Sequence, residues 1–141
     1  MLHSIIGGFL VLHGLITSFI GFGAVSNPNA AAMAVPAWMA WWPGPFGRSW
    51  VIDALGLGSG AAIVGGLIWL AAGLSLFAGG LGWLGVGPLE EQRLPLLVGG
   101  AALGLVAVGL YFHPFYLAAV LIDVAIVGLL WGQFAPARAG A

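Results

Sequence analysis

The stretch Phe115-Tyr-Leu-Ala-Ala-Val-Leu-Ile-Asp123-Val-Ala-Ile-Val-Gly-Leu-Leu-Trp131 is almost unbroken apolar sequence with one carboxylic acid, Asp123, at its centre. A bilayer is spanned by a helix of about 20 such residues. An ionisable group at that depth raises the free energy of insertion by about 2.5 kcal/mol or more, so it faces protein, water or a bound partner rather than lipid. The stretch predicts a transmembrane helix in which Asp123 has a polar partner.

The rest of the chain has the same character. Of its 141 residues, 62% are hydrophobic and 5% are charged, and the mean hydropathy is +1.13. Soluble domains carry about 25% charged residues, so lipid must be the solvent for most of this surface. The net charge of −1, without a basic run, gives no footprint for nucleic acid. The lack of cysteine excludes disulfides, thiolate chemistry and iron–sulfur ligation.

The apolar runs predict an all-α fold, a transmembrane four-helix bundle formed by one membrane domain over residues 1–141. We expect helices at about 3–25, 60–83, 94–112 and 115–133, with an interfacial segment at 26–56 between the first two. The first run is longer than the core of a signal peptide and no Lys or Arg precedes it, which favours a retained helix.

Turn signals and glycines support these bounds. Pro28, flanked by two asparagines, ends the first helix; residues 88–95 form a short polar connection; and the residue before Pro114 is pushed out of helical geometry.

Small residues recur on helix faces, which lets backbones approach closely in lipid. They include the heptad-spaced Gly7, Gly14 and Gly21 and the GxxxG step Gly100–Gly104.

Aromatic residues gather where the chain is expected to meet the membrane surface, namely Trp38, Trp41, Trp42, Trp50 and, in the last turn, His113. Tryptophan favours this boundary because it has an apolar ring and one N–H. We interpret the 26–56 segment as an anchoring cap; the alternative is a lid over a ligand cleft. Arg48 and Asp53 are candidates for an ion pair, although five residues is a poor spacing within a helix.

The most specific candidate site is a polar pair inside the membrane. His13 lies about ten residues into the first helix, and Asp123 lies about ten residues before the end of the fourth, which returns to the same side. At 1.5 Å per residue both are roughly 15 Å deep. We therefore expect His13 and Asp123 to meet, with Thr17 on the same side of the first helix as His13.

Four interpretations of this pair stay open. It can lock the first and fourth helices together, as buried polar groups do in membranes. It can contact a bound quinone, lipid or similar ligand. It can belong to a proton or substrate path, which normally needs several ionisable groups or a hydrated cavity. Finally, His13 can ligate a haem or a chlorophyll-type pigment. The sequence identifies no cofactor.

Other chemistry has little support. The three histidines are far apart in sequence, which gives no metal-ligand spacing. The glycine-rich residues 56–60 are followed by no lysine, unlike a phosphate-binding loop. No serine or threonine has the setting of a nucleophile. We therefore expect a protein that is not an enzyme.

The chain resembles a broad group of small bacterial four-helix membrane proteins often described as DoxX-like. The resemblance rests on the His13-Gly14 step in the first helix, the long first loop, Gly66-Leu-Ile-Trp-Leu-Ala-Ala-Gly73 in the second helix and the very short third turn. It implies the four-helix architecture. Some members are accessory subunits of respiratory quinone complexes, which adds to the ligand interpretation by analogy.

We therefore expect a non-catalytic subunit or scaffold of a membrane complex that holds an apolar cofactor, quinone or lipid near His13 and Asp123. The alternative is a small proton-coupled or ligand transporter acting as an oligomer. The expected partners are the lipid bilayer and other membrane subunits or further copies of the chain. Arg93 and Arg138 on one side against Arg48 on the other predict both termini in the cytoplasm, in a bacterial inner membrane.

Overall fold

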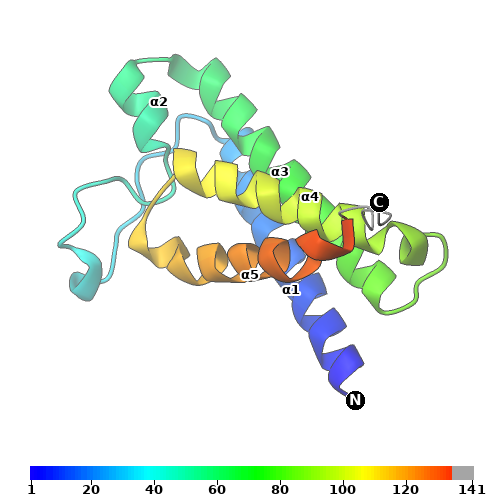
Figure 1. Cartoon of the computed structure of the whole chain (residues 1–141). Helices are drawn as coiled ribbons and strands as arrows, with labels where there is room; N and C mark the ends of the chain where they lie inside the picture. Colours follow the sequence, from blue (N-terminus) through cyan, green and yellow to red (C-terminus); the bar gives the residue numbers. More distant parts are fainter. Residues whose placement is uncertain (135–141) are drawn as a thin grey trace, which may run out of the picture.

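The computed structural model describes residues 1–134, and these are helical with loops and turns between (Figure 1). The long helices and short turns follow one another as α1 (Leu2–Ser26), η1 (Ala37–Met39), α2 (Trp50–Leu55), α3 (Gly58–Trp83), α4 (Leu89–Leu110), η2 (Pro114–Tyr116) and α5 (Leu117–Phe134). Four of the described helical segments, α1, α3, α4 and η2 with α5, are long and apolar enough to cross a membrane. The predicted all-α transmembrane bundle is confirmed, and the chain is an integral membrane protein.

The helices pack in a chain-like order. α1 packs on α3, α3 lies beside α4 along most of its length, and α4 packs on α5 (Figure 1). Within residues 1–134 the backbones of α1 and α5 have little direct contact. The first and last spans therefore meet mainly through their side chains.

Glycines set the close approach of α1 and α3. A Cβ added at Gly14 would collide with the backbone of Phe77, and one added at Gly73 would collide with the backbone of Ser18. Backbone cannot move aside as a flexible side chain can, so these positions require glycine. The seven-residue glycine spacing predicted a packing face on the first helix, and this face is the α1–α3 interface.

The start of α4 differs from the sequence prediction. The helix begins at Leu89 rather than near residue 94, and Pro95 lies inside it. Glu90 and Glu91 occupy its first turn, where carboxylates interact favourably with the helix N-terminus. The Arg93 Nη1 donates a hydrogen bond of 3.0 Å to the Glu90 carbonyl. The residues expected to form a polar connection are therefore helical and place three charged side chains at one end of the bundle.

The 26–56 segment contains two short helical pieces joined by turns and irregular chain. An isolated bridge between Met33 and Phe46 closes a loop around η1. Ser49 caps α2, because its Oγ accepts from the Ile52 N–H at 3.2 Å and donates to the Leu110 carbonyl at 2.6 Å. This second bond ties the segment to the end of α4.

Candidate functional site

His13 and Asp123 meet in the interior of the bundle. The His13 Nε2 lies 3.0 Å from the Asp123 Oδ1, and the two residues are 8% and 2% exposed. An ionised carboxylate can only accept hydrogen bonds, so in that charge state the Nε2–H donates. The structure thus brings together two residues 110 positions apart in sequence, as their similar depth predicted.

A third helix completes the surroundings of the carboxylate. A Cβ added at Gly104 of α4 would collide with the Asp123 Oδ2. Asp123 therefore lies between His13 on α1 and the bare backbone of α4. The Gly100–Gly104 step predicted a packing face, but its two glycines have different neighbours, since Gly100 faces Leu76 of α3. The role of Gly104 in seating an acid was not visible from the sequence.

Thr17 is buried one turn from His13, but it does not join the pair. Its Oγ1 donates to the His13 carbonyl at 2.8 Å, a bond within α1. The expected position on the side of His13 is correct, whereas the hydroxyl proton is used by the backbone. Phe9, one turn earlier, stacks on the imidazole with a centroid distance of 6.3 Å and an interplanar angle of 3°. Phe9 was not among the predicted site residues.

An apolar groove lies between α1 and α5 on the N-terminal side of the pair. Its volume is about 350 Å³. It is lined by Ile6, Phe9 and Leu10 of α1, Trp83 of α3, and Ile122, Ala125, Ile126, Leu129 and Leu130 of α5. Several of these residues are within one helical turn of His13 or Asp123, so the groove ends beside the pair. We call this hollow the α1–α5 groove.

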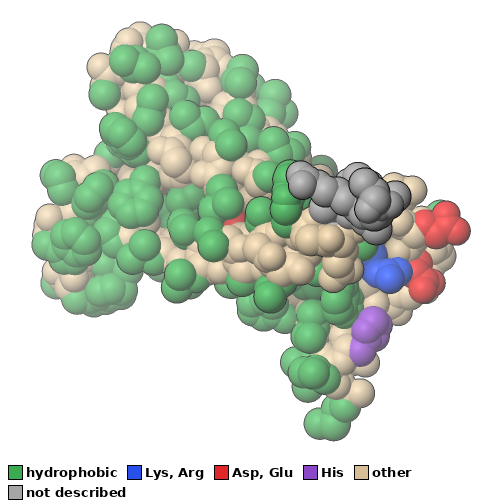
Figure 2. Space-filling view, in the orientation of Figure 1, with side chains coloured by type: hydrophobic (Ala, Val, Ile, Leu, Met, Phe, Trp, Pro, Cys, Tyr) green, Lys and Arg blue, Asp and Glu red, His purple; other side chains and the backbone are tan. Residues whose placement is uncertain are grey.

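A polar pocket of about 310 Å³ lies at the end of the bundle where α1 begins and α5 ends. Charged and histidine side chains gather at this end of the molecule (Figure 2). The lining residues come from four helices and the α3–α4 turn: His3, Trp83, Gly85, Glu90, Arg93, Leu94 and Gln133. We call it the N-terminal polar pocket. Arg138, which contributes to the orientation prediction, lies outside the described residues.

The predicted interfacial tryptophans have two kinds of position. Trp38, Trp41 and Trp50 are exposed, as a membrane-surface anchor requires. Trp50 also donates its Nε1–H to the Gly109 carbonyl at 3.2 Å. Trp42 is half-buried and packs edge-on against Phe112 at 5.1 Å. The aromatic segment is thus attached to the end of α4 as well as exposed to its surroundings.

His113 lies in the turn between α4 and η2, as expected, but its side chain is covered by protein. The residue is fully buried, and its ring lies 4.9 Å from that of Phe46. Its Nδ1 accepts from the Phe115 N–H at 3.2 Å, which caps η2. Burial lowers the pKa of His113 from its ordinary value of 6.5. The 26–56 segment folds over the turn and covers the histidine, which sequence spacing alone does not reveal.

The 26–56 segment also borders a hollow of about 400 Å³ against the end of α1. Met33, Phe46 and Gly47 of the segment face Phe19 and Ile20 of α1 across it. This hollow keeps the lid interpretation of the segment open beside the anchoring one.

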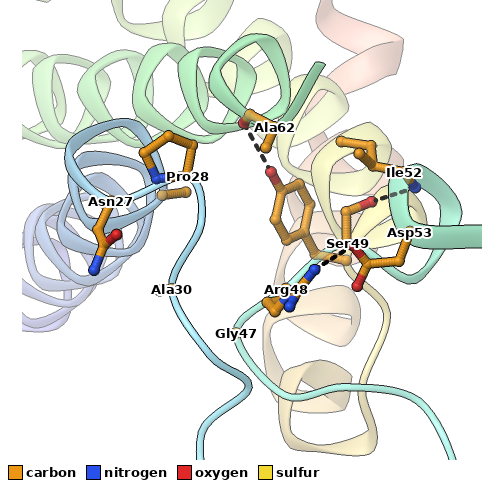
Figure 3. A pocket seen from close by; sticks show the side chains of 11 residues that line it. Asn27, Pro28, Ala30, Gly47, Arg48, Ser49, Ile52, Asp53 and Ala62 are labelled. Atoms are coloured by element: carbon orange, nitrogen blue, oxygen red, sulfur yellow. Dashed lines mark hydrogen bonds and ion pairs between the residues drawn. The ribbon is translucent and has the colours of Figure 1, made fainter. Parts of the chain in front are cut away.

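Arg48 and Asp53 form an ion pair in the same region. The Arg48 Nη2 lies 2.6 Å from the Asp53 Oδ1 (Figure 3). Helical spacing made this pair a weak prediction, but Arg48 precedes α2, so its chain turns back toward Asp53. The adjoining pocket is only about 20 Å³, and the Tyr111 hydroxyl beside it donates to the Ala62 carbonyl at 3.0 Å.

The described residues contain no group of three His, Cys, Asp or Glu side chains placed to hold a metal ion. Comparison of the chain with known protein families and characterised proteins, and with solved structures, gave no match.

Proposed function

We propose that this membrane protein is a non-catalytic subunit or scaffold that holds an apolar ligand, a quinone or a lipid chain, in the α1–α5 groove. The observation that carries the proposal is the position of this groove, which is about 350 Å³ and ends beside the His13–Asp123 hydrogen bond. Ligand pockets in proteins typically measure about 300–1,000 Å³ and have mainly apolar walls.

The polar pair supports a structural role. Its hydrogen bond joins α1 to α5, whose backbones otherwise have little contact among the described residues. Breaking it leaves a polar group in a low-dielectric interior, which is unfavourable. The pair therefore keeps the two walls of the groove at a fixed separation.

The transporter alternative has less support. A carrier that uses Asp123 needs water or substrate to reach the carboxylate, and this residue is 2% exposed. The α1–α5 groove is apolar, and neither His13 nor Asp123 lines it. We therefore place the pair in the framework of the protein and the ligand in the groove.

The surroundings of the chain are part of the same proposal. Many large apolar side chains on the described helices are exposed, which suits contact with lipid and with further membrane subunits or copies of the chain. The resemblance to DoxX-like proteins supports an accessory role in a bacterial inner membrane by analogy. The orientation with both termini in the cytoplasm rests on the positive-inside rule.

The proposal is tested by filling the groove. Ala125 lines it and is exposed, so Ala125→Trp should occupy the ligand space without disturbing the core. Ala118→Trp is the matched control, because Ala118 is exposed on the same helix and does not line the groove. The full-length proteins would be purified from native membranes, and bound quinone and lipid extracted and quantified by mass spectrometry.

We expect the native protein and Ala118→Trp to retain a stoichiometric apolar ligand and Ala125→Trp to lose most of it. Equal ligand content in all three proteins would contradict the groove as the site. Asp123→Asn addresses the rival function: a subunit should change only in assembly or ligand content, whereas loss of a measured transport activity with intact assembly would favour the carrier.

A further inference from the structure

We infer that the α1–α5 groove and the N-terminal polar pocket form one continuous site for a phospholipid with a zwitterionic aminophosphate headgroup. The inference rests on the proposed function and names its ligand. The acyl chain lies in the groove, and the headgroup lies in the polar pocket at the membrane surface.

The two hollows adjoin along all three helices that they share. Trp83 of α3 lines both. On α1, His3 of the polar pocket lies three residues, about one helical turn, before Ile6 of the groove. On α5, Gln133 lies about one turn after Leu129. Moving outward along the bundle, apolar walls therefore give way to polar ones within a single turn.

This order of chemistry matches one kind of molecule. A wholly apolar molecule would occupy only the groove, and a wholly polar molecule would occupy only the polar pocket. Trp83 stands at the boundary, with its ring stacked on that of His3 at 5.7 Å. Tryptophan favours the level at which lipid headgroups meet hydrocarbon. The site is thus amphipathic in the same direction as a bilayer lipid.

The charges in the polar pocket select the headgroup. Arg93 can donate five N–H groups, and among the described residues its guanidinium bonds only to the Glu90 carbonyl. Its Nη1 is 3.9 Å from the Glu90 Oε1, which is too long for a strong ion pair. Both side chains are about half exposed. The guanidinium is therefore available to a phosphate, with the His3 imidazole and the Gln133 amide at its side.

Glu90 distinguishes a zwitterionic from an anionic lipid. A headgroup carrying only negative charge would lie against the Glu90 carboxylate, and Glu91 is close by in the same helical turn. An aminophosphate headgroup places its phosphate at Arg93 and its ammonium at Glu90. A primary ammonium also donates hydrogen bonds to the carboxylate, which a trimethylated one cannot do.

The experiment uses native mass spectrometry of the full-length protein, incubated with equal amounts of phosphatidylethanolamine, phosphatidylcholine and phosphatidylglycerol of identical acyl chains. The variants are Arg93→Gln and Glu90→Gln. Their matched controls are Arg48→Gln, at the other end of the bundle, and Glu91→Gln, which is exposed and does not line the pocket. Because all four residues are partly or fully exposed, circular dichroism should show native helix content in each variant.

We expect phosphatidylethanolamine to be retained preferentially, and Arg93→Gln and Glu90→Gln each to reduce its retention up to about fivefold, as exposed ionic contacts allow. The two controls should change it little. Ala125→Trp, which fills the groove, should abolish the preference.

Other outcomes overturn the inference in distinguishable ways. Equal binding of all three lipids that is lost only in Ala125→Trp would leave the groove as an apolar site and remove the headgroup pocket. Preference for phosphatidylglycerol would contradict the role of Glu90. Retention of none of the three lipids would remove this inference, and the proposed function would fall with it only if the protein from native membranes also yielded no bound quinone or lipid.

Discussion

The carboxylate of Asp123 on α5 lies directly against the backbone of Gly104 on α4. It fits there because glycine has no side chain to occupy the space. Asp123 Oδ1 meanwhile contacts the His13 Nε2. The two carboxylate oxygens thus face different helices, and three of the four spans converge at this level. A single buried acid can therefore fix how three helices are arranged, because it needs the His13 imidazole on one side and the bare Gly104 backbone on the other.

Gly104→Ala should therefore displace Asp123. The added methyl would overlap the Oδ2, and overpacking of this kind destabilises proteins by about 1–3 kcal/mol. We expect a lower midpoint of denaturation in detergent and a weakened His13–Asp123 hydrogen bond, visible as a shift of the His13 imidazole resonances. Gly109→Ala on the same helix is the control, because a Cβ there meets no atom within 4 Å. Equal stability of the two variants would show that Asp123 can relax away from α4.

The coupling between His13 and Asp123 can be measured with a double-mutant cycle of His13→Leu, Asp123→Leu and the double variant. Each single change leaves one buried polar group unpaired, whereas the double change removes both, so the double variant should be less destabilised than the sum of the singles. Hydrogen bonds between membrane helices couple by about 0.6 kcal/mol on average and about 1.7 kcal/mol at most. Additive effects would mean that the pair does not hold α1 to α5.

The α1–α3 contact gives a third prediction. Gly14→Ala should separate the two helices, because the new methyl meets the backbone of Phe77. Gly8→Ala, on the same helix, meets nothing within 4 Å and should be neutral or slightly stabilising. Steric trapping or unfolding in mixed micelles would compare the two variants. Similar losses of stability in both would show that α1 does not depend on close approach at Gly14.

Hydropathy and helix counting are enough to predict the four spans and the shared depth of His13 and Asp123, because both depend only on chain length and the 1.5 Å rise. They are insufficient where one segment covers another. His113 is buried because Phe46, far away in sequence, folds over it. Arg48 reaches Asp53 because the chain turns before α2 rather than continuing as a helix. The α1–α5 groove exists because these two spans do not pack closely against each other. A run of apolar residues predicts a span but does not predict which other spans it packs against.

The buried position of His113 predicts a pH dependence of stability. Because burial lowers its pKa below the ordinary 6.5, the unfolded chain binds a proton at this residue more readily than the folded one. The contribution of His113 to the free energy of unfolding should thus be fully present above about pH 6.5 and decrease as the pH falls below that value. We expect the Tm in detergent to be lower at pH 5.5 than at pH 7.5.

His113→Asn is the variant that isolates this effect. The asparagine oxygen can accept from the Phe115 N–H in place of the imidazole Nδ1, so the cap of η2 is kept while the titrating group is removed. The rest of the chain is the same in both proteins, so a difference between their pH profiles reports on position 113. The wild-type Tm should therefore fall more steeply with decreasing pH than the Tm of the variant, and parallel curves would exclude His113 as a source of the acid sensitivity.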